Sequence, residues 1–282
     1  MKILSGNLAR SLVLGAAAAT MMTMGMSTGV MAADISGAGA TFPYPIYAKW
    51  AEAYKQTTGI GMNYQSIGSG GGIKQIKNHT VTFGASDMPL KQEELTEAGL
   101  IQFPMIMGGV VPVVNLKGIE PGQVKLDGPT LARIYRGDIA KWNDPAIKQI
   151  NADVELPNKA IAPVYRSDGS GTTFLFTHYL SATSPEFQQK IGTNTSVQWP
   201  AGIGAKGNEG VANMVKQTDG AIGYVEYAYA KQNRMNFARM KNQAGEFVEP
   251  TSETFQAAAA NADWANSPGY YVVLTNEPGS RS

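Results

Sequence analysis

The sequence contains no cysteine and only two histidines among its 282 residues. Without cysteine, the protein has no disulfide bond, no thiolate metal site and no cysteine nucleophile. It also lacks the lipid-modified cysteine that tethers some exported proteins to a membrane. His79 lies in a polar stretch, and His178 lies about two turns into an expected helix, so neither is placed as a catalytic base or as part of a metal site. We therefore expect a protein that is not an enzyme and that needs neither a metal nor a cofactor.

The sequence also lacks an excess of either charge, with 23 basic and 22 acidic residues. The first 33 residues contribute Lys2 and Arg10 and no acidic residue, so the rest of the chain has 21 basic and 22 acidic residues and a formal net charge of −1. A nearly neutral protein has no overall field that attracts nucleic acid, and its tryptophans show no stacking pattern with basic residues. We expect no nucleic-acid partner, and any bound anion must be held by a local site.

Beyond the N-terminus, the sequence has no apolar run long enough to span a membrane. The N-terminal segment begins with its two basic residues, continues with an apolar stretch at residues 12–19 and ends in small residues at 30–33. This layout predicts a secretory signal peptide at residues 1–33, cleaved after Ala32 or Ala33. The alternative is a membrane anchor, but the apolar core of this segment is too short to span a bilayer. An exported, soluble product without cysteine fits the periplasm of a Gram-negative bacterium.

Apolar runs alternate with helical patterns along the mature chain, which predicts an α/β protein with largely parallel sheets. Thr41 is expected to cap the first helix, which carries Pro43 in its first turn. The apolar stretch at residues 106–116 is split by glycines and a proline, so we interpret it as a crossing between two lobes. The expected strands are residues 34–38, 61–67, 81–86, 161–165 and 221–225, and the expected helices begin near residues 41, 92 and 145 or cover residues 73–78, 127–136, 173–180, 185–191, 208–217 and 251–260.

Three clusters of small residues stand between an expected strand and an expected helix, at residues 37–43, 68–72 and 169–172. A helix N-terminus presents unpaired N–H groups and a partial positive charge, and glycine lets the backbone come close to a ligand. One such cluster is more often an ordinary turn than a binding site. Three of them at the edge where open α/β sheets bind ligands predict a site for a small oxyanion.

Charged residues accompany these clusters. Arg166 offers a planar fork of donors to an anion, and Asp168, two residues later, is expected to pair with it and orient it. Asp87 follows an apolar strand and is either a helix or turn cap or a site residue; the residues alone leave both interpretations open. The segment 166–172 lacks the lysine and the spacing of a nucleotide-binding loop.

Five motifs occur in a characteristic order: GAGATFP at residues 37–43, GSGGGIKQI at 68–76, FGASD at 83–87, RSDGSGT at 166–172 and GAIGYVEY at 220–227. Together they resemble the periplasmic phosphate-binding proteins of bacterial phosphate-specific ABC importers. The resemblance extends from Asp34 to the end of the sequence.

This resemblance implies a type II periplasmic binding protein fold, in which two α/β lobes are joined by a two-strand hinge and hold the ligand in the cleft between them. It places the N-terminal part of the first lobe at residues 34–106, the second lobe at 107–276 and the start of a second hinge crossing at 277–282. Family members continue beyond that crossing to complete the first lobe. We therefore expect the C-terminal part of that lobe to be missing from a truncated sequence.

The resemblance also implies a set of phosphate contacts and a set of partners. An ionised Asp87 only accepts hydrogen bonds, so it favours a ligand that carries a proton, as phosphate does near neutral pH and sulfate does not. The implied partners are inorganic phosphate and the membrane permease of the importer with its ATPase, and the protein is expected to be a monomer. The alternatives are a receptor for another tetrahedral oxyanion, such as sulfate or molybdate, and a phosphatase. The implied ligand contacts are Thr41, Phe42 through its backbone N–H, Ser69, Asp87, Arg166, Ser170, Gly171 and Thr172, with Asp168 as the partner that orients Arg166.

Overall fold

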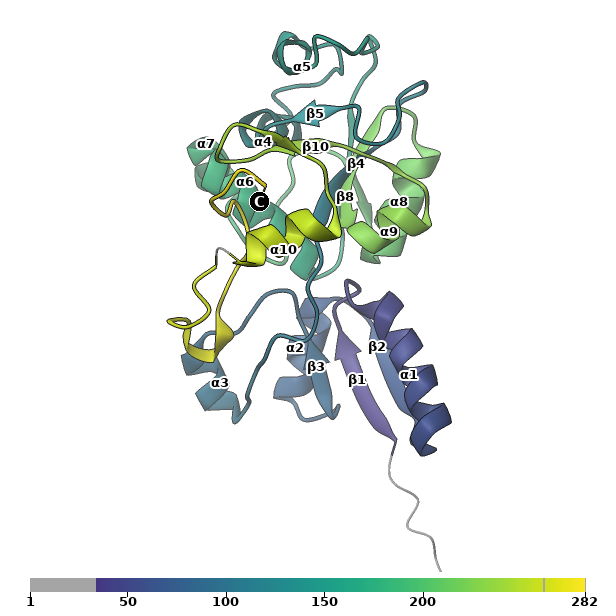
Figure 1. The fold of residues 1–282 in the computed structure, drawn as a ribbon, viewed down its shortest axis with the longest axis vertical. Coiled ribbons are helices and arrows are strands. Elements are labelled where there is room, and N and C mark those ends of the chain that lie inside the picture. The colour runs from purple at the N-terminus through teal and green to yellow at the C-terminus, as the bar shows by residue number, and fades with distance from the viewer. Residues whose placement is uncertain (1–33, 261, 282) are drawn as a thin grey trace, which may run out of the picture. The chain divides into compact units, whose positions relative to one another are not determined.

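A computed structural model describes residues 34–260 and 262–281 of the protein, and the expected signal peptide at residues 1–33 lies outside the described residues. The described residues belong to one compact unit that contains both parallel and antiparallel strand pairs flanked by helices (Figure 1). We call the part built on the sheet β2-β1-β3 lobe I and the part built on the sheet β7-β6-β8-β4-β9 lobe II. Within the described part of the chain, no helix has the length and apolar character needed to cross a membrane.

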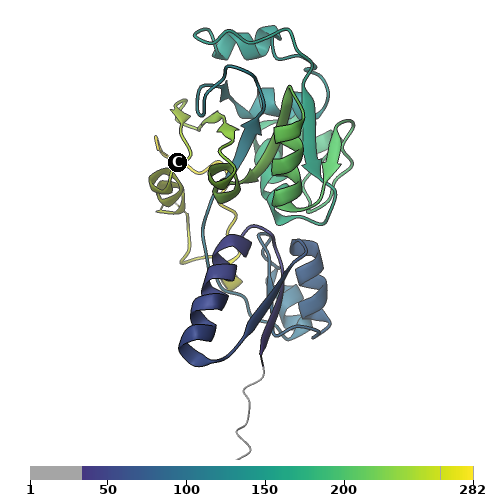
Figure 2. The ribbon, with the colours of Figure 1, turned by 90° about the vertical axis from the view of Figure 1, so that its right-hand side faces the viewer.

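Lobe I is a parallel sheet with a helix on each face. Because the strand order is β2-β1-β3, right-handed crossovers place α1 and α2 on opposite faces of the sheet (Figure 2). Gly37 of β1 leaves room for the ring of Phe83, since a Cβ at Gly37 would lie 2.2 Å from a ring atom. The elements of lobe I are β1 (Ile35–Gly39), α1 (Tyr44–Thr58), β2 (Met62–Ser66), α2 (Ser69–Lys77), β3 (Phe83–Ala85) and α3 (Gln92–Ala98).

Two expectations for lobe I are wrong in detail. Helix α1 begins at Tyr44 with Pro43 at its N-cap, and Thr41 does not cap it, because the Thr41 hydroxyl is engaged by Asn208 of lobe II instead. Helix α2 begins at Ser69 rather than at Ile73, so the glycine cluster forms its first turn. Packing outweighs the low helix propensity of glycine here, because a Cβ at Gly72 would lie 2.5 Å from the backbone of β1.

Lobe II is built on a mixed sheet. Strand β6 is parallel to both β7 and β8, whereas β4 runs antiparallel to β8 and β9, so the expectation of largely parallel sheets is confirmed for lobe I and only in part for lobe II. The apolar stretch at residues 106–116 contains β4, whose Val110 pairs with Glu226 at the end of β8. The strands of this sheet are β4 (Val110–Val114), β6 (Ala162–Arg166), β7 (Ile203–Ala205), β8 (Ala221–Glu226) and β9 (Asn236–Phe237).

Helices and a second small sheet complete the described part of the chain. The side chains of Asp127 and Asp144 each accept a backbone N–H at a helix start, at 2.8 and 2.9 Å, so each aspartate caps its helix. The small sheet has the order β11-β10-β5. The remaining elements are β5 (Lys125–Leu126), α4 (Gly128–Tyr135), α5 (Pro145–Ile150), α6 (Gly171–Thr183), α7 (Pro185–Lys190), α8 (Gly207–Gln217), α9 (Tyr227–Gln232), β10 (Arg239–Lys241), β11 (Phe247–Val248), α10 (Ser252–Ala260) and the 3₁₀ turn η1 (Pro268–Tyr270).

The core of lobe II supports the turn that leads from β6 into α6. The rings of Phe176 and Tyr224 stack with their centroids 4.1 Å apart. The hydroxyl of Tyr224 accepts the backbone N–H of Arg166 at 3.2 Å and lies 2.8 Å from the hydroxyl of Thr173. Both ends of the turn are therefore tied to a fully buried side chain on β8.

Lobe I borders an apolar groove of about 1650 Å³, lined among others by Tyr47, Trp50 and Leu95. The segment that leaves α3 contributes apolar side chains that are strongly exposed, including Ile101 at 88% and Phe103 at 64%. Phe42 and Asp87 also line this groove, so it reaches the junction of the two lobes.

Candidate functional site

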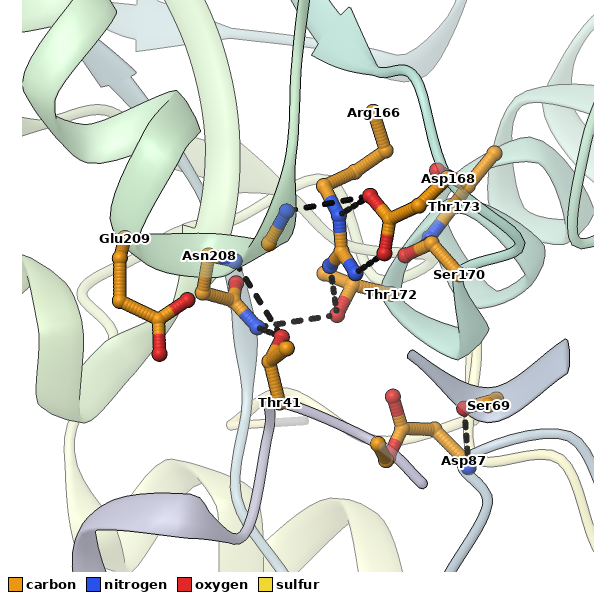
Figure 3. Close-up of polar contacts among 12 residues, drawn as sticks. Thr41, Ser69, Asp87, Arg166, Asp168, Ser170, Thr172, Thr173, Asn208 and Glu209 are labelled. Carbon is orange, nitrogen blue, oxygen red and sulfur yellow. Dashed lines mark hydrogen bonds and ion pairs between the residues drawn. The ribbon is translucent and has the colours of Figure 1, made fainter. Parts of the chain in front are cut away.

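The starts of four helices, α1, α2, α6 and α8, meet at the junction of the two lobes. Gly70, in the first turn of α2 of lobe I, donates its backbone N–H to the carbonyl of Gly169 at 3.0 Å, just ahead of α6 in lobe II. Thr41, ahead of α1, contacts the first turn of α8. Figure 3 shows side chains from all these segments directed toward one another. The structure thus brings together the three glycine clusters that the sequence singled out.

Arg166, the last residue of β6, is held in one orientation by Asp168. Its Nε donates to Oδ1 at 2.8 Å and its Nη2 donates to Oδ2 at 2.6 Å, which confirms the expected pair. Burial raises the pKa of Asp168, but the hydrogen bonds and charge of Arg166 outweigh burial, so the pKa lies below its usual value. The Arg166 side chain is 1% exposed, and its Nη1 faces Thr172 at 3.5 Å. The guanidinium is therefore a fixed donor that points into the junction.

The start of α6 supplies further donors. The Ser170 hydroxyl oxygen caps the helix by accepting the N–H of Thr173 at 3.0 Å, so the hydroxyl proton remains available for another acceptor. Gly171 and Thr172 occupy the first turn, where backbone N–H groups have no partner within the helix. A Cβ at Gly171 would lie 2.4 Å from Oγ of Ser69 and 2.6 Å from Oδ2 of Asp87. Only glycine at this position permits lobe I to approach α6 this closely.

Asp87 follows β3 and faces α6 across the junction. Its backbone N–H donates to Oγ of Ser69 at 3.2 Å, and α3 begins at Gln92 with Lys91 as its N-cap, so Asp87 does not cap that helix. Burial raises the pKa of the Asp87 carboxyl to about 7, although Arg166 and a hydrogen bond from Thr172 act to lower it. Asp87 therefore changes its charge close to neutral pH.

Thr41 and Phe42 reach the junction from the segment ahead of α1. The Thr41 side chain is buried, and its carbonyl accepts the hydroxyl of Tyr229 in lobe II at 2.6 Å. The Phe42 ring lies against the backbone of residue 108, since a Cβ at Gly108 would be 2.9 Å from its Cζ. Each of the nine site residues named from the sequence therefore lies at or beside this junction.

The sequence predicted a helix at residues 208–217 but did not indicate that the start of this helix, α8, belongs to the site. Gly207 donates its N–H to Oδ1 of Asp168 at 3.0 Å, and Asn208 binds the Thr41 hydroxyl. The segment KGNEG at residues 206–210 repeats the theme of small polar residues ahead of a helix, and this signal was available. The preceding strand, β7, has only three residues, which is too short to give a strand pattern in the sequence.

Glu226, at the end of β8, is a second acidic group that sequence reasoning missed. Burial raises the pKa of its carboxyl to about 7, the N–H of Ala228 lowers it, and the charge of Asp87 raises it. The carboxylate accepts the Ala228 N–H at 2.8 Å. Its place within the sequence GAIGYVEY gave no indication of burial, because a charged residue at a strand end is ordinarily exposed.

The junction combines many hydrogen-bond donors with one cation, and that cation is already paired with Asp168. An arrangement of this kind suits a small tetrahedral oxyanion, whose oxygens each accept hydrogen bonds from N–H and hydroxyl groups. Across residues 34–260 and 262–281, no group of three or more histidine, aspartate or glutamate side chains is arranged to hold a metal ion.

Comparison with known proteins gives consistent relatives. Residues 25–280 match the family model described as the PBP superfamily domain. The phosphate-binding protein PstS of Xylella fastidiosa (strain 9a5c) is 58% identical over 245 residues, which cover 87% of this chain and 67% of the relative. The phosphate-binding protein PstS of Pasteurella multocida (strain Pm70) is 58% identical over 251 residues, which cover 89% of this chain and 73% of the relative.

A solved structure confirms the fold. The high affinity periplasmic phosphate-binding protein PfluDING, solved with bound phosphate, superimposes with a TM-score of 0.61. The match covers 85% of this chain and 72% of that chain at 24% sequence identity. The expected two-lobed α/β fold of periplasmic binding proteins is therefore confirmed.

Proposed function

We propose that this chain, which belongs to the PBP superfamily and within it to the PstS family of phosphate-binding proteins, binds inorganic phosphate between its lobes in the periplasm and delivers it to the permease of an ABC importer. The observation that carries the proposal is the buried Arg166, which Asp168 orients toward donors of the opposite lobe. The names of the relatives and the bound phosphate in PfluDING support the choice of anion.

The proposed ligand contacts come from both lobes. Lobe I offers the Thr41 hydroxyl, the Phe42 N–H, the Ser69 hydroxyl and the Asp87 carboxylate. Lobe II offers the Arg166 guanidinium and the donors of the first turn of α6, at Ser170, Gly171 and Thr172. A ligand held from both sides favours the closed arrangement over an open one, because only the closed arrangement makes all of these contacts. We propose that residues 34–106 and 107–276 move as the two bodies.

Asp87 is the proposed discriminator between phosphate and sulfate. A carboxylate accepts hydrogen bonds and cannot donate them, so an ionised Asp87 needs a proton on the ligand oxygen that it faces. Monoprotonated phosphate supplies that proton, whereas sulfate places a second negative oxygen against the carboxylate. The same reasoning separates phosphate from molybdate, another tetrahedral oxyanion.

Binding without turnover is the second part of the proposal. The site offers an acidic group and many donors, but the two histidines are not directed into it: the His178 ring is hydrogen bonded to Thr275 at 2.6 Å, and His79 is exposed beyond the end of α2. Incubation with a phosphomonoester tests this point directly, since release of phosphate by the purified protein would identify a phosphatase instead.

Calorimetric titration with phosphate tests the binding site. Arg166→Ala is expected to weaken binding by at least about 2 kcal/mol, because it removes a charge-assisted donor and leaves Asp168 unpaired. Arg133→Ala is the matched control, since Arg133 is an exposed arginine on α4 of the same lobe. Wild-type affinity in the Arg166 variant, or a wild-type protein that binds sulfate in preference to phosphate, would contradict the proposal.

A further inference from the structure

Asn208 is a fully buried side chain that contacts both lobes at once. Its backbone N–H and its Nδ2 both donate to Oγ1 of Thr41, at 3.2 and 2.7 Å. The same Nδ2 faces Oγ1 of Thr172 at 3.4 Å, and Oδ1 accepts the backbone N–H of Glu226 at 2.9 Å. Figure 3 shows these contacts as dashed lines from Asn208 to the hydroxyls of Thr41 and Thr172.

The orientation of the Asn208 amide is set by its surroundings. The N–H of Glu226 needs an acceptor, so the amide oxygen must face it and the amide nitrogen must face Thr41. A flipped amide would place two donors against each other at Glu226 and leave Thr41 without one of its two donors. Asn208 is therefore a donor, and not an acceptor, toward the Thr41 hydroxyl.

This orientation decides what the Thr41 hydroxyl can do. A hydroxyl has two acceptor lone pairs and one proton to donate, and the two bonds from Asn208 occupy both lone pairs. The only remaining capacity of Oγ1 is to donate its proton. Thr172 is in a similar position, because Nη1 of Arg166 and Nδ2 of Asn208 both face its oxygen, at 3.5 and 3.4 Å.

We infer that Asn208 is a positioning residue that makes the Thr41 hydroxyl an obligatory donor to the bound anion. The inference rests on the proposed function and deepens it. A ligand oxygen facing Thr41 must accept a hydrogen bond, whereas a ligand oxygen facing an ionised Asp87 must carry a proton and donate it. The two groups together set the orientation of a singly protonated anion in the site. Asn208 thereby contributes to ligand selection without contacting the ligand.

A double-mutant cycle tests this inference by calorimetric titration of the full chain with inorganic phosphate. Asn208→Ala is expected to weaken phosphate binding about tenfold, the usual net value of about one to two hydrogen bonds. In the Thr41→Val background, which has no hydroxyl to position, the same change should weaken binding by less than about threefold. Thr41→Ser should restore the tenfold effect, because serine keeps the hydroxyl.

Asn208→Asp separates the positioning role from a purely structural one. It keeps an oxygen for the N–H of Glu226 but replaces the donor to Thr41 with an acceptor, so the Thr41 proton is drawn away from the ligand. Repulsion between the new carboxylate and phosphate is present in both Thr41 backgrounds and cancels in the cycle. Binding should therefore weaken by a larger factor with Thr41 than with Thr41→Val.

The matched control is Asn151→Ala. Asn151 is a buried asparagine of lobe II that bonds to the backbone of Lys125 and Ile147. Its loss should lower the melting temperature and leave the phosphate Kd unchanged. Equal factors for Asn208→Ala in both Thr41 backgrounds, or an unchanged Kd, would overturn the inference.

Wild-type titrations distinguish this inference from the proposed function. If the wild type binds sulfate rather than phosphate, the proposed function fails, and the same cycle run with sulfate still decides the role of Asn208. If the wild type binds neither anion, both are overturned.

Discussion

Sulfate is the sharpest probe of Asp87, because it has the shape of phosphate but carries no proton near neutral pH. If Asp87 must share a proton with the ligand, sulfate binds only when Asp87 itself is protonated. Raising the pH from 7 to 9 should then weaken sulfate binding while phosphate binding stays nearly constant. The perturbation is therefore a change of pH, and the quantity measured is the ratio of the two association constants.

The magnitude follows from the pKa of Asp87, which burial raises to about 7. Below that pH the carboxyl is largely protonated and can donate to a sulfate oxygen. Each pH unit above the pKa adds about 1.4 kcal/mol to the free energy needed to keep the proton on Asp87. Sulfate association should thus fall about 50-fold between pH 7 and 9, with a slope that approaches about tenfold per pH unit at the upper end of this range. Monoprotonated phosphate brings its own proton and needs no uptake from solvent.

Other charged groups lie close to Asp87, so variants must show that Asp87 causes the pH dependence of sulfate binding. The pKa of Glu226 is also raised to about 7 by burial, and the ion pair of Arg166 and Asp168 lies on the facing side of the junction. In the Asp87→Asn variant, sulfate binding should no longer depend on pH between 7 and 9, since the amide supplies a permanent donor. In the Glu226→Gln variant the slope should persist.

Titration calorimetry at constant ionic strength, at pH 7, 8 and 9 and with both anions, provides the measurement. Constant ionic strength matters because the screening of charges depends on it. Two results refute the reasoning: a sulfate affinity of the wild type that is independent of pH, or a tenfold slope that survives in Asp87→Asn. Either would mean that the carboxyl of Asp87 does not share a proton with the ligand.

Two further substitutions test the close approach of the lobes and the core of lobe II. Gly171→Ala should weaken phosphate binding at least about tenfold, because the added Cβ would lie 2.4 Å from Oγ of Ser69. The control is Gly210→Ala on α8, where the nearest atom to the added Cβ is 3.5 Å away. This variant should bind phosphate like the wild type in the same titration. Trp142→Ala should lower the free energy of unfolding, measured with urea, by about 3–5 kcal/mol, since Trp142 is fully buried. Trp50→Ala, at an exposed position on α1, should lower the free energy of unfolding by a clearly smaller amount.

Much of the fold could be read from short stretches of sequence. The helices at residues 127–136 and from residue 145 were predicted, and in the structure each begins with an aspartate that accepts a backbone N–H within the first turn. The pair of Arg166 and Asp168 was also predicted, since its members are two positions apart. The short strands β5, β9, β10 and β11 were not predicted, because two or three residues carry too little periodicity to reveal a strand whose pairing partner is distant.

The segments that form the site were predicted, but the hydrogen bonds that join them across the two lobes were not. The glycine clusters marked the places where backbone approaches closely, and the structure shows why Gly171 is needed. The sequence around Thr41 predicts a helix cap, but its hydroxyl bonds to a residue 167 positions away. For the same reason, the sequence did not indicate that Asn208, at the start of α8, belongs to the site.

Local chemistry was enough to establish the α/β class, the Arg166 pair and the small-residue turns, because each depends on contacts between near neighbours in the chain. Tertiary packing alone decided that the clusters from two lobes meet, that Asn208 occupies both lone pairs of the Thr41 hydroxyl, and that burial raises the pKa of Asp87 to about 7. These last properties depend on which groups exclude water from one another, and only the folded chain determines that.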